Sequence, residues 1–181
     1  MFSILVTGGA GYIGSHTCLS LIKKGYKIIV FDSLINSTYK SLERVSQIVS
    51  KEDINWKKNF KFYKGDLKNI KNLEEIFIES EKENSPIKGV IHFGGLKSVE
   101  ESVKFPLKYW ENNVIGSINL IKIMDKYKCY KLVFSSSATV YGIKNSKLLK
   151  EQFKPDPQNP YGTTKFVIEK FLYDIVDNCL S

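Results

Sequence analysis

The chain has 181 residues, of which 43% are hydrophobic and 13% aromatic, so it can bury a substantial core. Its net charge of +8 comes from lysine, since Arg44 is its only arginine. Arginine pairs best with phosphates and base edges, and the lysines form no basic run, so no nucleic-acid partner is expected. No segment has the ~18 consecutive apolar residues of a membrane span, and the start lacks the features of a signal peptide. A cytoplasmic protein with no membrane partner is therefore expected.

Cysteine and histidine are sparse and scattered. Cys18, Cys129 and Cys179 show no Cys-x-x-Cys pairing, so neither a disulfide framework nor a zinc site is expected. His16 and His92 are isolated from other metal-binding side chains, and ordinary packing or a turn contact is the expected role of each. No metal site is predicted.

Short apolar runs alternate with helical patterns along the chain, which is typical of βαβ units around a parallel sheet. The apolar runs predict strands over residues 2–6, 27–31, 60–63, 89–93 and 131–135. Helical spacing predicts helices over residues 12–24, from Ile70, from near Pro106 and from near Tyr161. A polar loop is expected over residues 51–59.

The predicted fold is α/β, a Rossmann-like doubly wound parallel sheet. Residues 1–181 are expected to form one domain, because no linker or repeat interrupts the pattern. Such a sheet normally has at least one further strand after the last helix. The fold is therefore expected to be truncated before its last strand or strands.

A glycine-rich segment follows the first predicted strand and opens the first predicted helix. Gly8, Gly11 and Gly14 give the pattern Gly-x-x-Gly-x-x-Gly, the form typical of extended short-chain enzymes. Such a turn lets the backbone approach a pyrophosphate, whose charge faces the positive end of the helix dipole. The alternative interpretation is a structural glycine turn.

Two acidic residues follow the next strands. Asp32 comes eighteen positions after Gly14, where a carboxylate can accept hydrogen bonds from the adenosine ribose and repel a 2′-phosphate. NAD is therefore favoured over NADP, although Asp32 can also be a plain turn residue. Asp66 can accept from the adenine amino group or cap the helix that follows.

Three residues near the end of the chain form a candidate catalytic set. Tyr161 and Lys165 are four positions apart, so they share one helix face. A tyrosine hydroxyl has a pKa of about 10 in water, and a neighbouring ammonium lowers it by favouring the phenolate. Ser137 follows the fifth predicted strand and can help pass a proton. Alone, Tyr-x-x-x-Lys indicates an amphipathic helix; with the glycine loop and Asp32 it indicates a nicotinamide-dependent enzyme.

At these residues the chain resembles the N-terminal half of the UDP-glucose 4-epimerases, a family of extended short-chain dehydrogenases. The resemblance covers nearly the whole chain, and its most selective part is Gly95-Leu96-Lys97. It rests on residues 6–17, 32–37, 92–99, 101–103, 112–114, 135–142 and 160–165.

The resemblance implies an NAD site, a UDP-sugar substrate and the role of each candidate residue. Tyr161 would be the acid and base, Ser137 its helper, and Lys165 a ligand of the nicotinamide ribose. Lys97, Ser137 and Tyr161 would contact the substrate. The implied NAD contacts are Gly8, Gly11, Tyr12, Ile13, Gly14, Asp32, Ser33, Leu34, Ile35, Asn36, Ser37, Asp66, Leu67, Phe93, Gly94, Gly95, Leu96, Lys97, Asn112, Ser137, Tyr161 and Lys165.

The implied reaction oxidises C4 of a UDP-hexose to a ketone and returns the hydride to the other face. It interconverts UDP-glucose and UDP-galactose, as galactose metabolism requires. The resemblance also implies a homodimer, formed through helices near residues 114–124 and 166–176.

The chain departs from the family pattern in two places. Gly94 stands where the family usually has alanine, which is expected only to loosen the loop. The C-terminal UDP-sugar-binding domain is absent, so the chain is expected to be a fragment that is weakly active alone, because it cannot position the sugar.

Two alternatives remain at this point. The first is an NAD-binding module or remnant without independent catalysis. The second is a nucleotide-sugar 4,6-dehydratase, which is disfavoured because Ala138-Thr139 follow Ser137 where those enzymes usually have an Asp-Glu pair.

Overall fold

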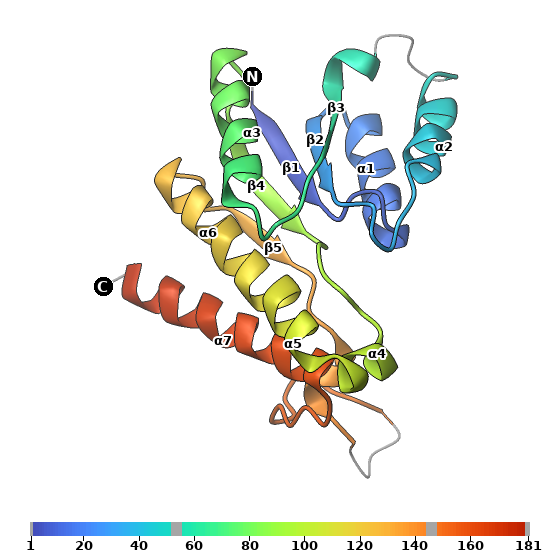
Figure 1. The fold of residues 1–181 in the computed structure, drawn as a ribbon. Helices are drawn as coiled ribbons and strands as arrows, with labels where there is room; N and C mark the ends of the chain where they lie inside the picture. Colours follow the sequence, from blue (N-terminus) through green and yellow to red (C-terminus); the bar gives the residue numbers. More distant parts are fainter. Residues whose placement is uncertain (1, 52–55, 144–147, 180–181) are drawn as a thin grey trace. The chain divides into compact units, whose positions relative to one another are not determined.

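The computed structural model describes residues 2–51, 56–143 and 148–179, without the side chains of residues 177–179 (Figure 1). The chain divides into two compact units. The first comprises Met1–Gly94 and Asn119–Ser135, and the second comprises Gly95–Ile118 and Ser136–Ser181. The sequence pattern does not indicate this division. Among the described helices, none combines the length and apolarity needed to cross a membrane.

The first unit contains a five-stranded sheet of order β3-β2-β1-β4-β5, in which every paired strand is parallel. This confirms the predicted strands and moves their ends by one or two residues. Because the order reverses between β1 and β4, the carboxyl ends of these two strands mark the switch point where α/β sheets bind ligands. The strands are β1 Ser3–Thr7, β2 Lys27–Asp32, β3 Phe60–Lys64, β4 Ile87–His92 and β5 Leu132–Phe134.

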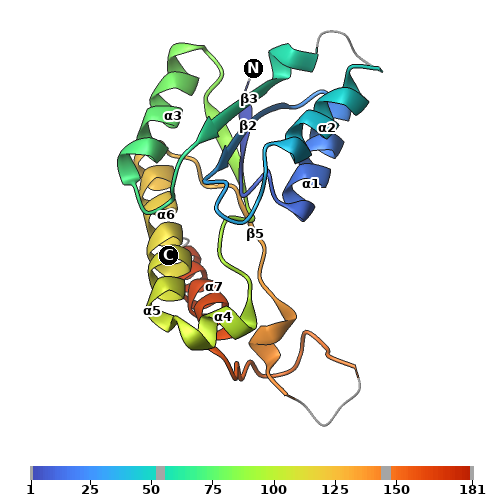
Figure 2. The same cartoon turned by 45° about the vertical axis from the view of Figure 1, so that its right-hand side comes forward.

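Helices cover both faces of this sheet, as a doubly wound fold requires (Figures 1 and 2). Helices α1 (Tyr12–Lys23) and α2 (Lys40–Val49) bury apolar side chains against one face, in a cluster that includes Cys18 and Val30. Helix α3 (Ile70–Lys82) and the later part of α6 (Gly116–Lys126) cover the other face. The sheet therefore lies between two apolar layers.

Two parts of this unit differ from the sequence prediction. Helix α2 was not expected, because its buried positions, Leu42 and Val45 among them, stand in a mostly polar stretch. Of the predicted loop over residues 51–59, residues 52–55 lie outside the described part of the chain. Its end is a 3₁₀ turn, Trp56–Asn59, in which Trp56 is buried with its ring 5.6 Å from that of Phe60.

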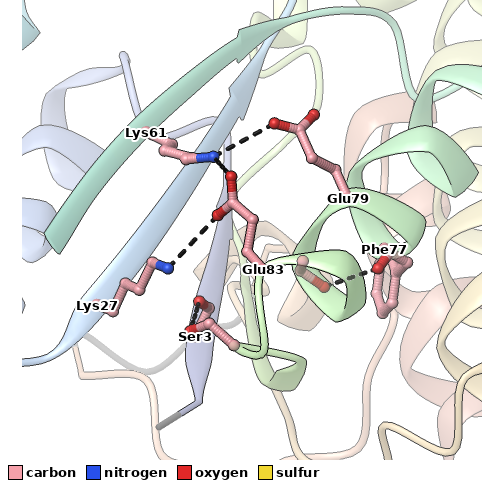
Figure 3. A network of polar contacts seen from close by, with 8 residues as sticks. Ser3, Lys27, Lys61, Phe77, Glu79 and Glu83 are labelled. Atoms are coloured by element: carbon pink, nitrogen blue, oxygen red, sulfur yellow. Dashed lines mark hydrogen bonds and ion pairs between the residues drawn. The ribbon is translucent and has the colours of Figure 1, made fainter. Parts of the chain in front are cut away.

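An ion-pair cluster joins α3 to β2 and β3 (Figure 3). Lys61 Nζ lies 3.3 Å from Glu79 Oε1 and also pairs with Glu83. Lys27 Nζ lies 3.5 Å from the second oxygen of Glu83. The hydrogen bond from Lys61 holds the pKa of Glu83 below its ordinary value. Partly exposed pairs such as these stabilise a fold only modestly, so the cluster adds little to the stability of this unit.

The second unit is helical. It contains α4 (Val99–Lys104), α5 (Pro106–Tyr109), a π-helical turn (Trp110–Ile115) and α7 (Pro160–Cys179). The single helix predicted from Pro106 is therefore three segments, α5, the π turn and α6. The last helix begins where expected, and the Asn159 side chain accepts a hydrogen bond from the Gly162 N–H at 2.8 Å in its first turn.

Candidate active site

The glycine loop in the first unit joins β1 to α1 and leaves no room for side chains. Gly8 has a φ of +67°, which L side chains rarely adopt, and its N–H donates to the Phe31 carbonyl at 2.8 Å. A Cβ on Gly14 would lie 2.7 Å from Gly9 Cα. Tyr12 and Ile13 begin α1 with largely exposed side chains, and no side chain caps this helix. The backbone thus forms a cradle that fits a pyrophosphate.

Asp32 is buried at the carboxyl end of β2, and its carboxylate organises the loops around it. Its Oδ2 accepts from the Ala10 N–H in the glycine loop at 3.0 Å. Its Oδ1 accepts from the Leu34 N–H at 2.9 Å and from the Ser37 hydroxyl at 2.8 Å. These bonds hold Leu34 in a left-handed conformation, with a φ of 61°. A carboxylate accepts about four hydrogen bonds, so one acceptor position is left for a ribose hydroxyl.

The other implied cofactor residues of this unit flank Asp32 or follow neighbouring strands. Ser33, Ile35 and Asn36 lie in the loop after β2, where Ile35 and Asn36 are exposed. Asp66 and Leu67 follow β3, and Phe93 and Gly94 follow β4. All of these positions lie beyond the carboxyl ends of parallel strands. The first unit therefore places these implied NAD contacts at one edge of its sheet.

That Gly94 loosens its loop stays a prediction, but the space for a side chain at this position is tight. A Cβ there would lie 2.7 Å from Leu67 Cδ1 and 3.2 Å from Thr7 Oγ1. The Gly94 N–H donates to Thr7 Oγ1 at 3.3 Å, and Thr7 Oγ1 also lies 2.6 Å from His92 Nδ1. His92 is buried in the sheet, as its expected packing role requires. The glycine makes room for the Leu67 side chain.

In the second unit, Asn113 holds the segment Gly95-Leu96-Lys97. Its Oδ1 accepts from the Leu96 N–H at 2.8 Å, and its Nδ2 donates to the Leu96 carbonyl at 3.0 Å. The same Nδ2 donates to Thr164 Oγ1 on α7 at 3.2 Å. Asn113 is buried, Lys97 is exposed, and Asn112, the neighbour implied by the resemblance, is half-buried.

Ser137 begins a 3₁₀ turn, Ala138–Tyr141, and its hydroxyl oxygen accepts twice from Thr139. The Thr139 N–H donates to Ser137 Oγ at 3.2 Å, and the two hydroxyl oxygens are 2.9 Å apart. With the Thr139 hydroxyl as donor, the Ser137 proton is left to donate elsewhere. The Ser136 hydroxyl is buried with no hydrogen-bond partner in the described part of the chain. A ligand beside these serines would satisfy it.

Tyr161 and Lys165 lie one turn apart on α7, as the spacing predicts. Lys165 is 5% exposed, and its burial lowers the pKa of the ammonium to about 8, against an opposing effect of Glu169. The Tyr161 ring meets the edge of the buried Tyr109 ring at a centroid distance of 6.4 Å. Tyr109 donates to Glu101 Oε2 at 2.9 Å and accepts from the Ser98 N–H at 3.0 Å.

The second unit thus contains all three candidate catalytic residues. Sequence reasoning missed Thr139 and Tyr109, which contact Ser137 and Tyr161, and Asn113, which contacts Leu96 and Thr164. Asn113 and Thr139 stand inside motifs already singled out, Asn-Asn-Val and Ser-Ala-Thr, so the only available signal was their place beside a candidate residue. Within the described residues, no three His, Cys, Asp or Glu side chains are grouped to hold a metal ion.

The fold and the glycine loop define an α/β protein of the short-chain dehydrogenase type. Residues 5–178 match a family model described as GDP-mannose 4,6 dehydratase, and the chain belongs to this family.

Proteins similar to this chain include UDP-glucose 4-epimerases. The UDP-glucose 4-epimerase of Bacillus subtilis (strain 168) is 47% identical over 173 residues, which are 96% of this chain and 48% of that protein. The enzyme of the same name from Dictyostelium discoideum is 47% identical over 172 residues, 95% of this chain and 46% of that protein. The chain therefore spans about half the length of these relatives.

Solved structures give the same result. UDP-glucose-4-epimerase from Stenotrophomonas maltophila, with bound NAD and formylated UDP-arabinopyranose, has a TM-score of 0.86 and 38% identity. The match covers 98% of this chain and 49% of that chain. UDP-glucose 4-epimerase from Bifidobacterium longum, in complex with NAD+ and UDP, has a TM-score of 0.85 and 41% identity, over 96% of this chain and 48% of that one.

Proposed function

We propose that this chain supplies the NAD site and the proton-transfer residues of a UDP-glucose 4-epimerase. The observation that carries the proposal is Tyr161 one turn before the buried Lys165, in a chain 47% identical to an enzyme of that name. The C-terminal half of the relatives, which has no counterpart here, would supply the rest of the UDP-sugar site. A homodimer remains a prediction.

The residues present fit NAD. The loop at Gly8 and Gly14 leaves a backbone cradle for the pyrophosphate, and Asp32 has an acceptor position for the adenosine ribose. The charge on Asp32 disfavours a 2′-phosphate, and Arg44, on α2, is the only arginine of the chain. We therefore infer that the chain binds NAD in preference to NADP.

Tyr161 would remove the proton from the 4-hydroxyl of the sugar. Lys165 is protonated in most molecules at neutral pH, since its pKa is about 8, so it presents a positive charge on the same helix face. Tyr161, one turn before it, would act as the base. Ser137, with its oxygen held by Thr139, would donate to the sugar oxygen as the proton moves. Tyr161 would return the proton to the ketone oxygen at the end of the cycle.

NAD, when bound, supplies the acceptor for the hydride from C4 and the donor that returns it. No second substrate is needed, because oxidation and reduction balance within one turnover. Inversion requires the ketone to turn over between the two hydride transfers. The chain's own contribution is to place proton donors and acceptors near the reacting hydroxyl, which commonly accelerates such steps by about 10²–10⁴-fold.

A 4,6-dehydratase is the second candidate, since the matching family model carries that description. Elimination across C5 and C6 requires an acid beside the catalytic hydroxyl residue. Ala138 and Thr139 occupy those positions, and neither side chain can act as that acid. The residues therefore favour epimerisation.

A hybrid enzyme tests the proposal directly. It joins residues 1–181 to the C-terminal half of the Bacillus subtilis relative and is assayed for conversion of UDP-galactose to UDP-glucose. We expect turnover that Tyr161→Phe reduces by at least about 10²-fold. A 4-keto-6-deoxy product would support the dehydratase instead, and unchanged turnover in Tyr161→Phe would exclude the assigned role of this residue.

A further inference from the structure

The loop after β3 is a tight turn with its acidic residue at the start. The Asp66 Oδ1 accepts from the Lys68 N–H at 2.9 Å, and its Oδ2 lies 3.6 Å from Lys68 Nζ. The Asp66 carbonyl accepts from the Asn69 N–H at 2.9 Å. The Gly65 N–H donates to the Asp32 carbonyl at 3.1 Å, which ties this loop to the end of β2. The turn therefore has a defined shape beside the candidate ribose site.

Asn119, on α6, fixes the next part of this turn from 51 or 52 residues away. Its Nδ2 donates to the carbonyl oxygens of Leu67 and Lys68, both at 3.1 Å. Carbonyl oxygens only accept hydrogen bonds, so the amide nitrogen, and not the amide oxygen, must face the loop. Both contacts lie within the first unit.

The carbonyl and the side chain of Leu67 are both held by contacts, whereas its N–H is available to a ligand. Its carbonyl accepts from Asn119, and its side chain packs on the sheet core and fills the space over Gly94. Among the described residues, no group accepts a hydrogen bond from its N–H. That N–H stands next in the chain to the Asp66 carboxylate. The turn thus presents a donor and an acceptor side by side, at the edge of the sheet where ligands bind.

We propose that Asn119 is a positioning residue that sets the purine specificity of the dinucleotide site. Adenine presents an amino donor beside the ring acceptor N1, which matches the Asp66 acceptor and the Leu67 N–H. Hypoxanthine presents a carbonyl oxygen and an N1–H in those places, so both contacts become mismatched. By holding the Leu67–Lys68 peptide, Asn119 keeps the Leu67 N–H aligned with N1. The inference rests on the proposed binding of NAD.

A purely structural role for Asn119 makes a different prediction. Asn119 also ties α6 to the loop that precedes α3, and a structural tie would stabilise the unit without selecting between bases. Lys126 and Glu74 form an ion pair that joins the same two helices and does not touch the loop. Lys126→Met is therefore a matched control, because it removes a link between α6 and α3 and leaves the Leu67 peptide held.

The experiment is calorimetric titration of the 181-residue chain with NAD and with nicotinamide hypoxanthine dinucleotide. We expect the original chain and Lys126→Met to prefer NAD by about tenfold or more, since each mismatched polar contact costs roughly that factor. Asn119→Ala should reduce the preference below about threefold. Asn119→Asp should reduce it further, because a carboxylate would face two carbonyl oxygens. Asn119→Ser, too short to span both oxygens, gives the same readout if Asn119→Ala does not fold.

Each remaining outcome overturns a specific step. Equal weakening of both dinucleotides in the Asn119 variants would leave Asn119 a structural residue and overturn the inference. Equal affinity of the original chain for the two dinucleotides would show that Asp66 and the Leu67 N–H do not recognise adenine. The proposed NAD site would be unaffected by that result. No binding of NAD by the original chain would overturn the proposed function and this inference with it.

Discussion

The Asp32 carboxylate accepts a hydrogen bond from the Ala10 N–H at 3.0 Å, so the acid that ends β2 also closes the glycine loop after β1. The sequence predicts this acid as a ribose ligand. In the fold it first joins two loops of the cofactor site to each other, with Leu34 and Ser37 held by its second oxygen. Under the proposed function, affinity for NAD and stability of the first unit are therefore linked through one side chain.

Asp32→Asn should weaken both properties. An amide in this place turns an NH₂ group toward donors that need an acceptor, whichever way it is oriented. We expect a loss of about 1–3 kcal/mol in the free energy of unfolding, the usual cost of a buried donor left unpaired. NAD affinity should fall with it, and NADP should not replace NAD. Urea unfolding and calorimetric titration measure the two effects, with the exposed Asp125→Asn as control; an unchanged unfolding curve would contradict the loop-closing role.

Thr139→Val should reduce turnover of the hybrid enzyme by about tenfold, because one hydrogen bond that orients the Ser137 hydroxyl is lost. Ser137→Ala removes the proton donor itself and should cost about 10²–10³-fold. Thr139→Ser keeps the hydroxyl and should restore most of the rate. The measurements are kcat and KM of each variant, and the orienting role fails if Thr139→Val and Thr139→Ser behave alike.

Lys165→Met should stabilise the chain at neutral pH, although it removes a candidate catalytic residue. Burial lowers the pKa of Lys165 from its ordinary 10.5 to about 8, so the folded chain bears the cost of a buried charge. Below pH 8 Lys165 is protonated in both the folded and the unfolded chain, so the full free-energy cost of burying its charge applies. Between pH 8 and 10.5 the folded chain releases the proton and the cost declines, and it vanishes at higher pH.

The decline of this cost with rising pH gives a measurable difference in stability between Lys165→Met and the original chain. The free energy of unfolding of Lys165→Met should exceed the original by up to about 3 kcal/mol at pH 7 and by much less at pH 10. The exposed Lys170→Met, on the same helix, should show no such trend. Urea unfolding at both pH values provides the test, and a gap that widens with rising pH would contradict the buried charge.

Tyr109→Phe should separate stability from catalysis in the second unit. The variant removes the hydroxyl that joins Glu101 to the Ser98 N–H and keeps the ring that meets Tyr161. We expect a loss of about 1–2 kcal/mol in stability with kcat of the hybrid enzyme reduced less than about threefold. Tyr109→Ala removes the ring as well and should cost about 3–5 kcal/mol. Thermal unfolding measures the stability of each variant, and steady-state kinetics measures its kcat. A large loss of kcat in Tyr109→Phe would show that the hydroxyl network acts on Tyr161.

Local signals predicted much of the fold and of the candidate site. The strands are short segments rich in Val, Ile, Leu and Phe, and the glycine loop and Tyr161–Lys165 are defined by spacing along a few residues. Such features depend on the chain's own geometry, so a single sequence contains them. Helix α2 was missed because its buried side chains are few, and Trp56 was missed because it stands among polar residues.

The contacts that hold the candidate residues in place could not be predicted in this way. Asn119 meets Leu67 across 52 residues, and Asn113 meets Thr164 across 51. In a sequence, an asparagine within a helical pattern cannot be distinguished from any other polar surface position. Only the fold shows which group accepts its hydrogen bond. A period of 3.6 residues likewise does not predict the π turn at Trp110–Ile115, because its hydrogen bonds join residues five positions apart.

The fate of a deuterium at C4 is the most direct test of the central claim. UDP-galactose labelled with deuterium at C4 is converted by the hybrid enzyme, and the UDP-glucose formed is analysed by mass spectrometry and NMR. Transient oxidation at C4 predicts that the product retains the deuterium at C4 and that Tyr161→Phe forms almost none of it. Loss of the deuterium to solvent, or equal product from Tyr161→Phe, would contradict the proposed mechanism.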